Sequence, residues 1–350
     1  MKEAREAKKL KFLIAGFGSI GRRHFRNLLA LGERDIVFYR SQKGTLPPDE
    51  LAGFVVETDL QKALSLRPDA VIVSNPTSLH LDVAIPAAEA GCHLFIEKPI
   101  SHTLARVGEL REAVSHGSRQ LFVGFQYRFH PGLQKVRDLV SSDKIGRPLS
   151  ARAHWGEYLP GWHPWEDYRQ GYSARSDLGG GVILTLCHPL DYLRWILGDV
   201  SELWAFTGRI GDLDLEVEDT AEIGLRFSNG ALGSVHLDYN QQPSAHRLEI
   251  VGTQGTIRWD NTDGTVALYK AGEDSSTTAP PLWERIQTAT NIERNEMFQA
   301  EMVHFISIVN GEVPPLCSLE DGIRALELAL AAHRSQSTKQ VVRLQENAHL

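Results

Sequence analysis

The feature that most constrains the fold is a glycine-rich segment near the N-terminus, where Gly16, Gly18 and Gly21 follow the spacing G-x-G-x-x-G. The apolar run 10–15 before it is typical of a buried parallel strand, and residues 20–31 after it carry apolar side chains at helical spacing. In this context the spacing predicts a dinucleotide-binding turn. The first glycine permits the turn, the second lets the backbone approach a pyrophosphate, and the third lets the helix pack closely against the strand.

The same segment predicts which cofactor the chain prefers. In NAD-binding folds a carboxylate about 20 residues beyond the glycines binds the ribose 2′-hydroxyl. Here the predicted second strand, 35–39, is followed by Arg40, Ser41 and Lys43, with no carboxylate. Arg40 can form bidentate bonds to a 2′-phosphate, so the sequence favours NADP(H) over NAD(H), although a surface arginine at a strand end is the alternative. The expected contacts to the phosphates come from Gly16, Gly18, Ser19, Ile20 and Gly21, and those to the adenosine ribose from Arg40 and Ser41.

The pattern of apolar residues changes about a third of the way along the chain. Before residue 125, short apolar runs alternate with helical stretches, which indicates a parallel sheet covered on both faces. From residue 221 the alternation has a period of two, and Asn229-Gly230 between two such runs predicts a type I′ hairpin. We therefore expect an α/β N-terminal Rossmann domain over 10–127, followed by an α+β C-terminal domain over 128–345 with an open, mostly antiparallel sheet.

Composition excludes several classes of function. The 350 residues are 42% hydrophobic with a net charge of −7, so we expect two globular domains and no nucleic-acid partner. The three cysteines lack a C-x-x-C pair, which argues against a structural zinc or a disulfide framework, and no metal is expected. No apolar run reaches the ~18 residues of a membrane helix, and the N-terminus lacks the apolar core of a signal peptide. The sequence thus predicts a cytoplasmic protein with no membrane partner.

Three further motifs lie beyond the glycine turn. They are Ser74-Asn75-Pro76-Thr77-Ser78-Leu79-His80, then Glu97-Lys98-Pro99, then Gly179-Gly180-Gly181 followed by His188-Pro189-Leu190-Asp191. Glu97-Lys98-Pro99 ends a predicted parallel strand, the edge at which open α/β sheets bind ligands. In order and spacing, over about residues 10 to 335, the four motifs resemble the glucose–fructose oxidoreductase/inositol dehydrogenase (Gfo/Idh/MocA) family.

The resemblance implies an NAD(P)-dependent oxidoreductase with its active site in the crevice between the domains. Such an enzyme transfers a hydride between nicotinamide and a secondary hydroxyl of a sugar, aminosugar, nucleotide sugar or cyclitol. It also implies that Glu97 lies near the nicotinamide ribose, that the Lys98–Pro99 peptide is cis and that Lys98 meets the substrate oxygen. The residues implied to line the dinucleotide are Asn75, Pro76, Thr77, His80, Glu97 and Lys98.

His188 is implied to act with Lys98 as acid/base, because a proton must move when a hydride leaves an alcohol carbon. Desolvation beside a cationic nicotinamide would also favour the neutral lysine amine. The family usually has an aspartate four residues before this histidine, where the present chain has Leu184, and counting forward from the triple glycine gives Thr185. Either the segment is one residue shorter or the Thr185 hydroxyl is a third catalytic group. Asp191 could orient the imidazole, cap the helix or lie on its surface.

The densest aromatic stretch, 154–169, carries three of the seven tryptophans. Flat rings interleaved with His, Glu, Asp and Arg suit a polyol, but a loop that packs its rings on the sheet is the alternative. Arg128 is expected to be an ion-pair partner between the domains. The residues predicted to bind the substrate are Gln126, Tyr158, Trp162, His163, Tyr168 and His188.

Two other functions stay open: an NAD-dependent glycoside-cleaving enzyme of the same fold, and a non-catalytic dinucleotide-sensing protein. The intact Lys98 and His188 argue against the sensor. The alternation in 221–239 leaves one face of the sheet uncovered. The resemblance to the family implies association through that sheet. A homodimer or homotetramer is therefore expected.

Overall fold

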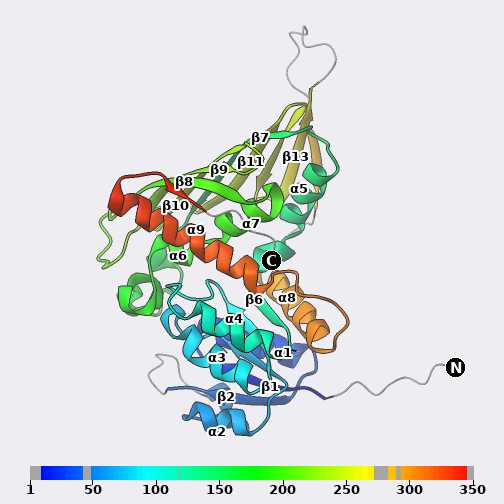
Figure 1. Cartoon of the computed structure of the whole chain (residues 1–350), viewed down its shortest axis with the longest axis vertical. Helices are drawn as coiled ribbons and strands as arrows, with labels where there is room; N and C mark the ends of the chain where they lie inside the picture. Colours follow the sequence, from blue (N-terminus) through cyan, green and yellow to red (C-terminus); the bar gives the residue numbers. More distant parts are fainter. Residues whose placement is uncertain (1–8, 42–48, 118, 272–282, 289–292, 345–350) are drawn as a thin grey trace, which may run out of the picture. The chain divides into compact units, whose positions relative to one another are not determined.

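The computed structural model describes residues 9–41, 49–117, 119–271, 283–288 and 293–344 (Figure 1). The chain forms two compact units. The first contains Met1–Gly124 together with Phe298–Ile323, and the second contains Phe125–Met297 together with Arg324–Leu350.

The first unit is built on a six-stranded sheet of order β3-β2-β1-β4-β5-β6, in which every pair of neighbours is parallel. This is the strand order of a dinucleotide-binding Rossmann fold, so the predicted class of this unit is confirmed. Its strands are β1 (Lys11–Ala15), β2 (Asp35–Tyr39), β3 (Val55–Glu57), β4 (Ala70–Val73), β5 (His93–Glu97) and β6 (Leu121–Gly124). Its helices are α1 (Ser19–Ala30), α2 (Leu60–Ser65), α3 (His80–Glu89) and α4 (Val107–Ser115).

The central strands are apolar because both of their faces are covered. All residues of β4 and β5 are buried, and Phe12, Leu13 and Ile14 of β1 have no exposed surface. Helix α3 packs against β4, β5 and α4. Burial on both faces explains why these strands read in the sequence as short continuous apolar runs.

The predicted division at residues 127 and 128 needs one correction, because Phe298–Ile323 returns to the first unit. This segment contains most of α8 (Arg294–Val309) and the start of α9 (Leu319–Thr338). The Phe305 ring lies 5.4 Å from that of Phe95, and the Val123 backbone N–H donates to the Cys317 carbonyl at 3.1 Å. The apolar side chains of a helix do not reveal in the sequence which sheet they cover.

The second unit is built on a nine-stranded sheet of order β14-β13-β12-β11-β7-β10-β9-β8-β15. All neighbours are antiparallel except β7 and β10, as expected for an open, mostly antiparallel sheet. The strands are β7 (Pro148–Gly156), β8 (Val200–Gly208), β9 (Thr220–Phe227), β10 (Leu232–Asp238), β11 (Ala245–Gly252), β12 (Gly255–Asp260), β13 (Thr265–Lys270), β14 (Glu284–Gln287) and β15 (Val342–Arg343). Helices α5 (Pro131–Ser141) and α7 (His188–Leu197) pack on each other; α5 also contacts β12 and β13, and α7 contacts β7.

The turn between β9 and β10 is not the predicted type I′ turn. Gly230 has a φ of +88°, but Asn229 is absent from the non-glycine residues of positive φ. The Gly230 N–H donates to the Phe227 carbonyl and the Phe227 N–H to the Ala231 carbonyl, both at 2.9 Å. This is a type I turn followed by a left-handed glycine, the next commonest hairpin connection.

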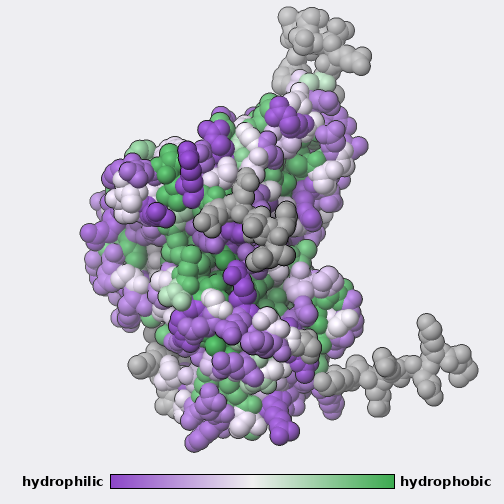
Figure 2. Space-filling view, in the orientation of Figure 1, coloured by the Kyte–Doolittle hydropathy of each residue, from purple (hydrophilic) through white to green (hydrophobic). Residues whose placement is uncertain are grey.

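One face of this sheet carries exposed apolar side chains. On β8, Trp204 and Phe206 are 44% and 64% exposed, whereas Leu203 and Ala205, which point to the opposite face, are buried. Figure 2 shows hydrophilic residues interspersed with hydrophobic ones over the face drawn. Apolar residues at alternate positions of one strand therefore mark a sheet face that is not covered within the described chain. None of the described helices is long and apolar enough to cross a membrane.

The glycine turn makes a prediction about stability. A Cβ at Gly16, whose φ is +99°, would lie 2.6 Å from the Asn75 backbone nitrogen, and one at Gly21 would meet the Gly16 carbonyl oxygen. Gly16→Ala and Gly21→Ala should therefore each lower the free energy of unfolding by about 2–4 kcal/mol. Gly18→Ala is the matched control, because its Cβ would meet nothing within 4 Å, and should cost less than about 1 kcal/mol. Equal costs for the three variants in urea denaturation would contradict this reading.

Candidate functional site

The glycine turn lies where the strand order reverses, between β1 and β4. The Ser74 hydroxyl, just after β4, donates to the carbonyls of Ala15 and Gly16 at 3.1 and 3.2 Å. The Gly16 N–H donates to the Tyr39 carbonyl of β2 at 3.0 Å. These bonds fix the turn to the carboxyl ends of three strands, and ligands bind at such a reversal in open α/β sheets.

The start of α1 has the features of a phosphate site. Gly18 is the N-cap residue, no side chain caps the helix, and its first turn has no acidic residue. Backbone N–H groups and the helix dipole therefore favour an anion there. The open space around the Gly18 α-carbon permits close approach of a pyrophosphate. The turn fits a dinucleotide, whose phosphates Gly18, Ser19 and Ile20 would hold.

The segment after β4 forms a second turn at the same edge of the sheet. Asn75 and Pro76 precede a short helix, and Thr77 within it is buried. His80 is enclosed: its Nδ1 lies 2.9 Å from the Pro99 carbonyl oxygen and its Nε2 3.0 Å from that of Asn75. Burial lowers the pKa of His80, and a neutral ring donates to only one of these two carbonyl oxygens at a time. The structure thus gives His80 a positioning role, and its contact with the dinucleotide stays a prediction.

Arg40 and Ser41 follow β2 at this same edge. Arg40 is partly exposed, and its backbone N–H donates to the Glu57 carbonyl at 3.1 Å. Residues 42–48, with Lys43 among them, lie outside the described residues. The arginine is thus at a strand end with its side chain accessible, as a contact to the adenosine ribose requires.

Lys98 directly follows β5, and the Lys98–Pro99 peptide is cis, as expected. Glu97 before it is only 7% exposed, and its carboxylate lies 2.6 Å from His24 Nε2 of α1. His24 itself is fully buried. Sequence reasoning missed His24, because a histidine in the helix after the turn shows no sign of pairing with a carboxylate 73 positions away.

His188 begins α7 in the second unit and is 1% exposed. Aromatic rings surround its imidazole, with ring centroids at 4.9 Å for Tyr127, 5.3 Å for Trp155 and 5.5 Å for Phe125. The His246 ring stacks on Trp155 at 4.3 Å, and burial lowers its pKa well below the usual range. The ring of His188 is therefore oriented by packing against rings.

Asp191, one turn after His188, forms a buried ion pair with Arg128. The Arg128 guanidinium donates to both carboxylate oxygens, at 2.6 and 2.9 Å, and both side chains are 2% exposed. Arg128 is an ion-pair partner as expected, but the pair lies within the second unit and does not join the two units. The alternative that Asp191 lies on the helix surface is also wrong, because its side chain is buried. Removing either partner would leave a buried charge unpaired, which typically costs 3–5 kcal/mol.

Thr185 and Leu184, the two candidates for the family's aspartate position, lie in the short helix α6 (Val182–Thr185). Thr185 is 3% exposed and its hydroxyl interacts with the phenol of Tyr239. Burial raises the pKa of that phenol well above its usual range, so Tyr239 stays protonated. No carboxylate occupies either position, and the hydroxyl of Thr185 is the polar group that this helix offers.

The residues predicted to bind substrate have different environments. Gln126 is 5% exposed, and its side-chain carbonyl oxygen has no hydrogen-bond partner among the described residues. Trp162 packs edge-on against Tyr239 at 5.6 Å, just beyond the end of β10. Tyr158 is 37% exposed, whereas the Tyr168 hydroxyl accepts a bond from the Asp214 N–H at 3.1 Å. The imidazole of His163, the last of them, lies 5.3 Å from the ring of Trp165.

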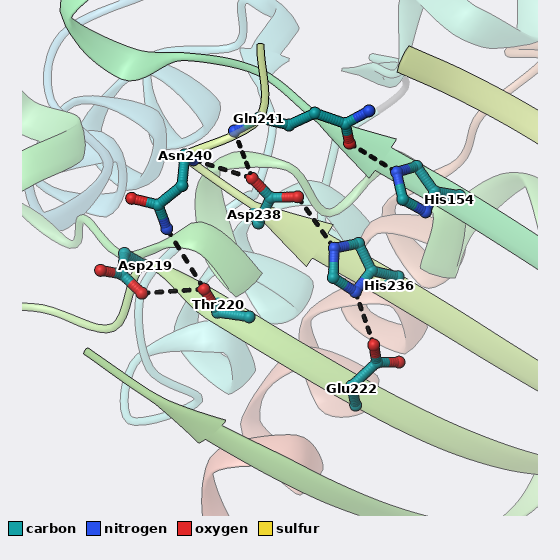
Figure 3. Close-up of polar contacts among 8 residues, drawn as sticks. All are labelled: His154, Asp219, Thr220, Glu222, His236, Asp238, Asn240 and Gln241. Carbon is teal, nitrogen blue, oxygen red and sulfur yellow. Dashed lines mark hydrogen bonds and ion pairs between the residues drawn. The ribbon is translucent and has the colours of Figure 1, made fainter. Parts of the chain in front are cut away.

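A polar network that the sequence did not suggest lies on the open face of the sheet (Figure 3). Among the described residues, His154, His236 and Asp238 place one possible ligand atom each within 4.8 Å of the others. Those atoms are already engaged: His236 contacts Asp238 at 2.8 Å and Glu222 at 2.6 Å, and His154 contacts Gln241 at 2.6 Å. The bond to Asp238, and then that to Glu222, raises the pKa of His236, and an imidazolium repels a cation. The three side chains therefore form a hydrogen-bonded network that is poorly suited to a metal.

Comparison with known proteins places these features in a family. Residues 10–125 match the oxidoreductase family with an NAD-binding Rossmann fold, and residues 133–258 match the GFO/IDH/MocA C-terminal domain. Myo-inositol 2-dehydrogenase of Thermotoga maritima is 29% identical over 95% of this chain and 98% of its own. 1,5-anhydro-D-fructose reductase of Ensifer adhaerens is 28% identical over 79% of this chain and 80% of its own.

Solved structures share the whole architecture. Levoglucosan dehydrogenase, solved in complex with NADH and levoglucosan, superposes with a TM-score of 0.84 at 21% identity, over 96% of this chain and 100% of the other. GenD2 from gentamicin A biosynthesis, in complex with NAD, gives a TM-score of 0.79 over 98% of both chains. The order of the motifs, the six-stranded Rossmann sheet and the matched residues agree, and the chain belongs to the Gfo/Idh/MocA family of NAD-binding oxidoreductases.

Proposed function

We propose that this protein oxidises a secondary hydroxyl group of a sugar or cyclitol, reversibly, with a nicotinamide dinucleotide as hydride acceptor. The observation that carries the proposal is the arrangement at the carboxyl edge of the Rossmann sheet. There an uncapped helix N-terminus suited to a pyrophosphate follows β1, and the side chain of Lys98 follows β5, on the other side of β4 in the same sheet. Relatives named for inositol, levoglucosan and anhydrofructose support the class of substrate.

When bound, the nicotinamide ring supplies the site that accepts a hydride. The remaining requirement is to move the hydroxyl proton, and we assign that proton to Lys98 and His188. Lys98 in its amine form can accept it. The aromatic rings around His188 hold its imidazole in one orientation, as an acid/base group requires. The hydroxyl of Thr185 is the third group of the proposed set.

Gln126 is the strongest candidate for a substrate contact outside this set. Its buried and unpartnered carbonyl oxygen can accept a bond from a hydroxyl of the substrate, and a buried acceptor without a partner costs about 1–3 kcal/mol. Tyr158 offers an exposed ring on which the C–H face of a sugar can stack. His163, Trp162 and Tyr168 complete the proposed substrate set, and a cytoplasmic location stays a prediction.

Catalysis can be tested by substitution at the two proton-handling residues. Lys98→Ala and His188→Gln should each lower kcat by about 10²-fold or more on the substrate found by screening sugars and cyclitols. The affinity for the dinucleotide should barely change, since neither residue holds the phosphates. The loss of kcat in the double variant should be much smaller than the product of the two single losses, because both residues act on the same proton. A large loss of kcat in Thr185→Ala would make the Thr185 hydroxyl a third member of this set. A small loss would leave it a structural role.

Lys62→Ala removes an exposed lysine from the first unit, which also contains Lys98, and it is the control for loss of a lysine. Near-normal turnover by Lys98→Ala would exclude the mechanism. Cofactor that stays bound and oxidised after each turnover, with no net change in nicotinamide absorbance, would favour the glycoside-cleaving alternative.

The cofactor preference remains a proposal for NADP(H), resting on Arg40 and the missing carboxylate after β2. Arg40→Ala should weaken the binding of NADP⁺ by about tenfold or more in titration calorimetry and leave NAD⁺ almost unchanged. Arg34→Ala, an exposed arginine in the same unit, is the matched control and should change neither. Tighter binding of NAD⁺ than of NADP⁺ by the unmodified protein would overturn the preference.

We also propose that the protein is a homodimer or homotetramer that buries the open face of its second sheet. The exposed Trp204 and Phe206 on that face support this, because apolar side chains gathered on a sheet face favour association. Light scattering at micromolar concentration should give two or four times the mass of the chain. Phe206→Glu should reduce that mass, and a monomeric unmodified protein would contradict the proposal.

A further inference from the structure

Glu218, which lies shortly before β9, carries a largely buried carboxyl group that the proposed mechanism does not use. Its side chain is 14% exposed. The Glu218 carbonyl oxygen accepts a bond from the Val182 N–H at 3.1 Å, and its carboxyl oxygen Oε1 accepts one from the Ile183 N–H at 3.2 Å. Val182 and Ile183 are the first two residues of α6, and the N–H groups at such positions have no partner within a helix. Glu218 thus bonds the start of this helix through both its main chain and its side chain.

The triple glycine before α6 leaves room for this carboxyl group. Its third member, Gly181, has a φ of +106°, and a Cβ there would collide with both carboxyl oxygens of Glu218. A side chain at Gly181 would therefore push the carboxyl group away from the helix. Because a helix of four residues is not stable by itself, contacts from outside such as this one hold it in place.

Asp219, the next residue, fixes the same segment to the sheet. It is fully buried, and its carboxylate accepts bonds from the N–H groups of Ile210 and Gly211, both at 2.9 Å. The Thr220 hydroxyl donates to the same carboxylate at 2.9 Å (Figure 3). The Asp219 carbonyl oxygen accepts a bond from the N–H of Tyr239, which follows β10, at 2.9 Å. Two adjacent residues therefore hold α6 on one side and Tyr239 on the other.

The two elements held in this way carry hydroxyl groups that meet. Thr185, at the end of α6, interacts with the phenol of Tyr239, and that phenol also donates to the Ser173 carbonyl at 3.4 Å. Helix α6 contacts both β9 and β10. Because Glu218 bonds α6 and Asp219 bonds Tyr239, loss of the Glu218 contact would let one hydroxyl move relative to the other.

The charged group that faces the Glu218 carboxyl from α9 is His333, whose Nε2 lies 3.7 Å from Oε1. Burial raises the pKa of Glu218, and the charge of His333 lowers it. A carboxyl oxygen accepts a bond from an N–H group whether the carboxyl is ionised or protonated. The contact with Ile183 therefore does not depend on one charge state of Glu218.

We propose that Glu218 is a positioning residue for the Thr185 hydroxyl: by holding the start of α6, it fixes where that hydroxyl lies relative to the Tyr239 phenol. The place of Thr185 in the proton-handling set rests on the proposed function, whereas the bond between Glu218 and α6 does not. Glu218 acts through the helix and needs no contact with substrate or cofactor.

The positioning can be measured on the whole protein without substrate or cofactor. The threonine methyl groups are labelled with ¹³C, and the Thr185 resonance, assigned by its loss in Thr185→Ala, is followed by NMR together with hydrogen exchange of the Ile183 amide. Glu218→Ala removes the acceptor, so this amide should exchange about fivefold faster or more, and the Thr185 resonance should move. Glu218→Gln keeps an oxygen in the same place and should bring both signals back towards those of the unmodified protein.

Glu216→Ala is the matched control, because it removes an exposed carboxylate two positions earlier that bonds to the Ser176 hydroxyl at 3.2 Å. It should leave both signals unchanged. If Glu218→Ala fails to fold, Glu218→Asp, whose carboxyl group is one methylene shorter, should change both signals in the same direction. An unmoved Thr185 resonance in a folded variant overturns the proposal, even if thermal stability falls. Equal changes in Glu218→Gln and Glu218→Ala overturn it as well.

A double-mutant cycle on an identified substrate provides a readout that a purely structural role would not give. Glu218→Ala should lower kcat by about tenfold or more with little change in KM, because misplacing a reacting group slows the chemical step. In a Thr185→Ala background the same substitution should lower kcat little further, since its effect passes through that hydroxyl. An equal loss in both backgrounds would contradict the proposal.

The two sets of measurements separate this proposal from the proposed function. A moved Thr185 resonance in a protein that oxidises no sugar or cyclitol would support the positioning and refute the function. Turnover that depends on Lys98 and Thr185, combined with an unmoved resonance in Glu218→Ala, would support the function and refute the positioning.

Discussion

The close approach of the glycine turn to the end of β4 is the constraint on which the cofactor-binding edge depends. Gly16 and Gly21 leave no room for a Cβ, and the Ser74 hydroxyl bonds to the carbonyls beside them. This contact brings the N-terminus of α1 over the carboxyl ends of β1 and β4, where its unpaired N–H groups can meet a phosphate. A side chain at either glycine would displace the helix from the sheet.

Each unit buries charged side chains, and most of these side chains are paired with a hydrogen-bonding partner inside the same unit. Arg128 and Asp191 satisfy each other through two hydrogen bonds, and Glu97 is bonded to His24. Such pairs cost much to break and fix the elements that carry them. Glu301 differs, because no described group bonds its oxygens, and a buried polar atom without a partner calls for a functional explanation.

The fold could be predicted from the sequence wherever a pattern is local. Strands buried on both faces read as apolar runs, and the spacing of Gly16, Gly18 and Gly21 identified the turn. The predicted hairpin type was wrong because Phe227 pairs with Ala231, which leaves a three-residue loop, and loops of that length favour a type I turn followed by a left-handed glycine. The return of Phe298–Ile323 to the first unit could not be predicted, since an apolar helix face does not specify its partner.

The sequence motifs predicted which residues would form the candidate site, but they did not predict the contacts that hold those residues in place. Lys98 and His188 stand in motifs, but His24 reaches Glu97, at the end of β5, from a position 73 residues before it. The His154–His236 pair likewise comes from strands that are distant in the sequence and neighbours in the sheet. Periodicity carries no information about which distant side chains meet, so these contacts required the structure.

The two groups assigned to proton transfer have different surroundings. Lys98 directly follows Glu97, whose carboxylate lies 2.6 Å from Nε2 of the buried His24. Aromatic rings surround His188, and their packing fixes the direction in which its nitrogens point. An acid/base group must keep its orientation while it takes up and releases a proton, and packing of this kind meets that requirement.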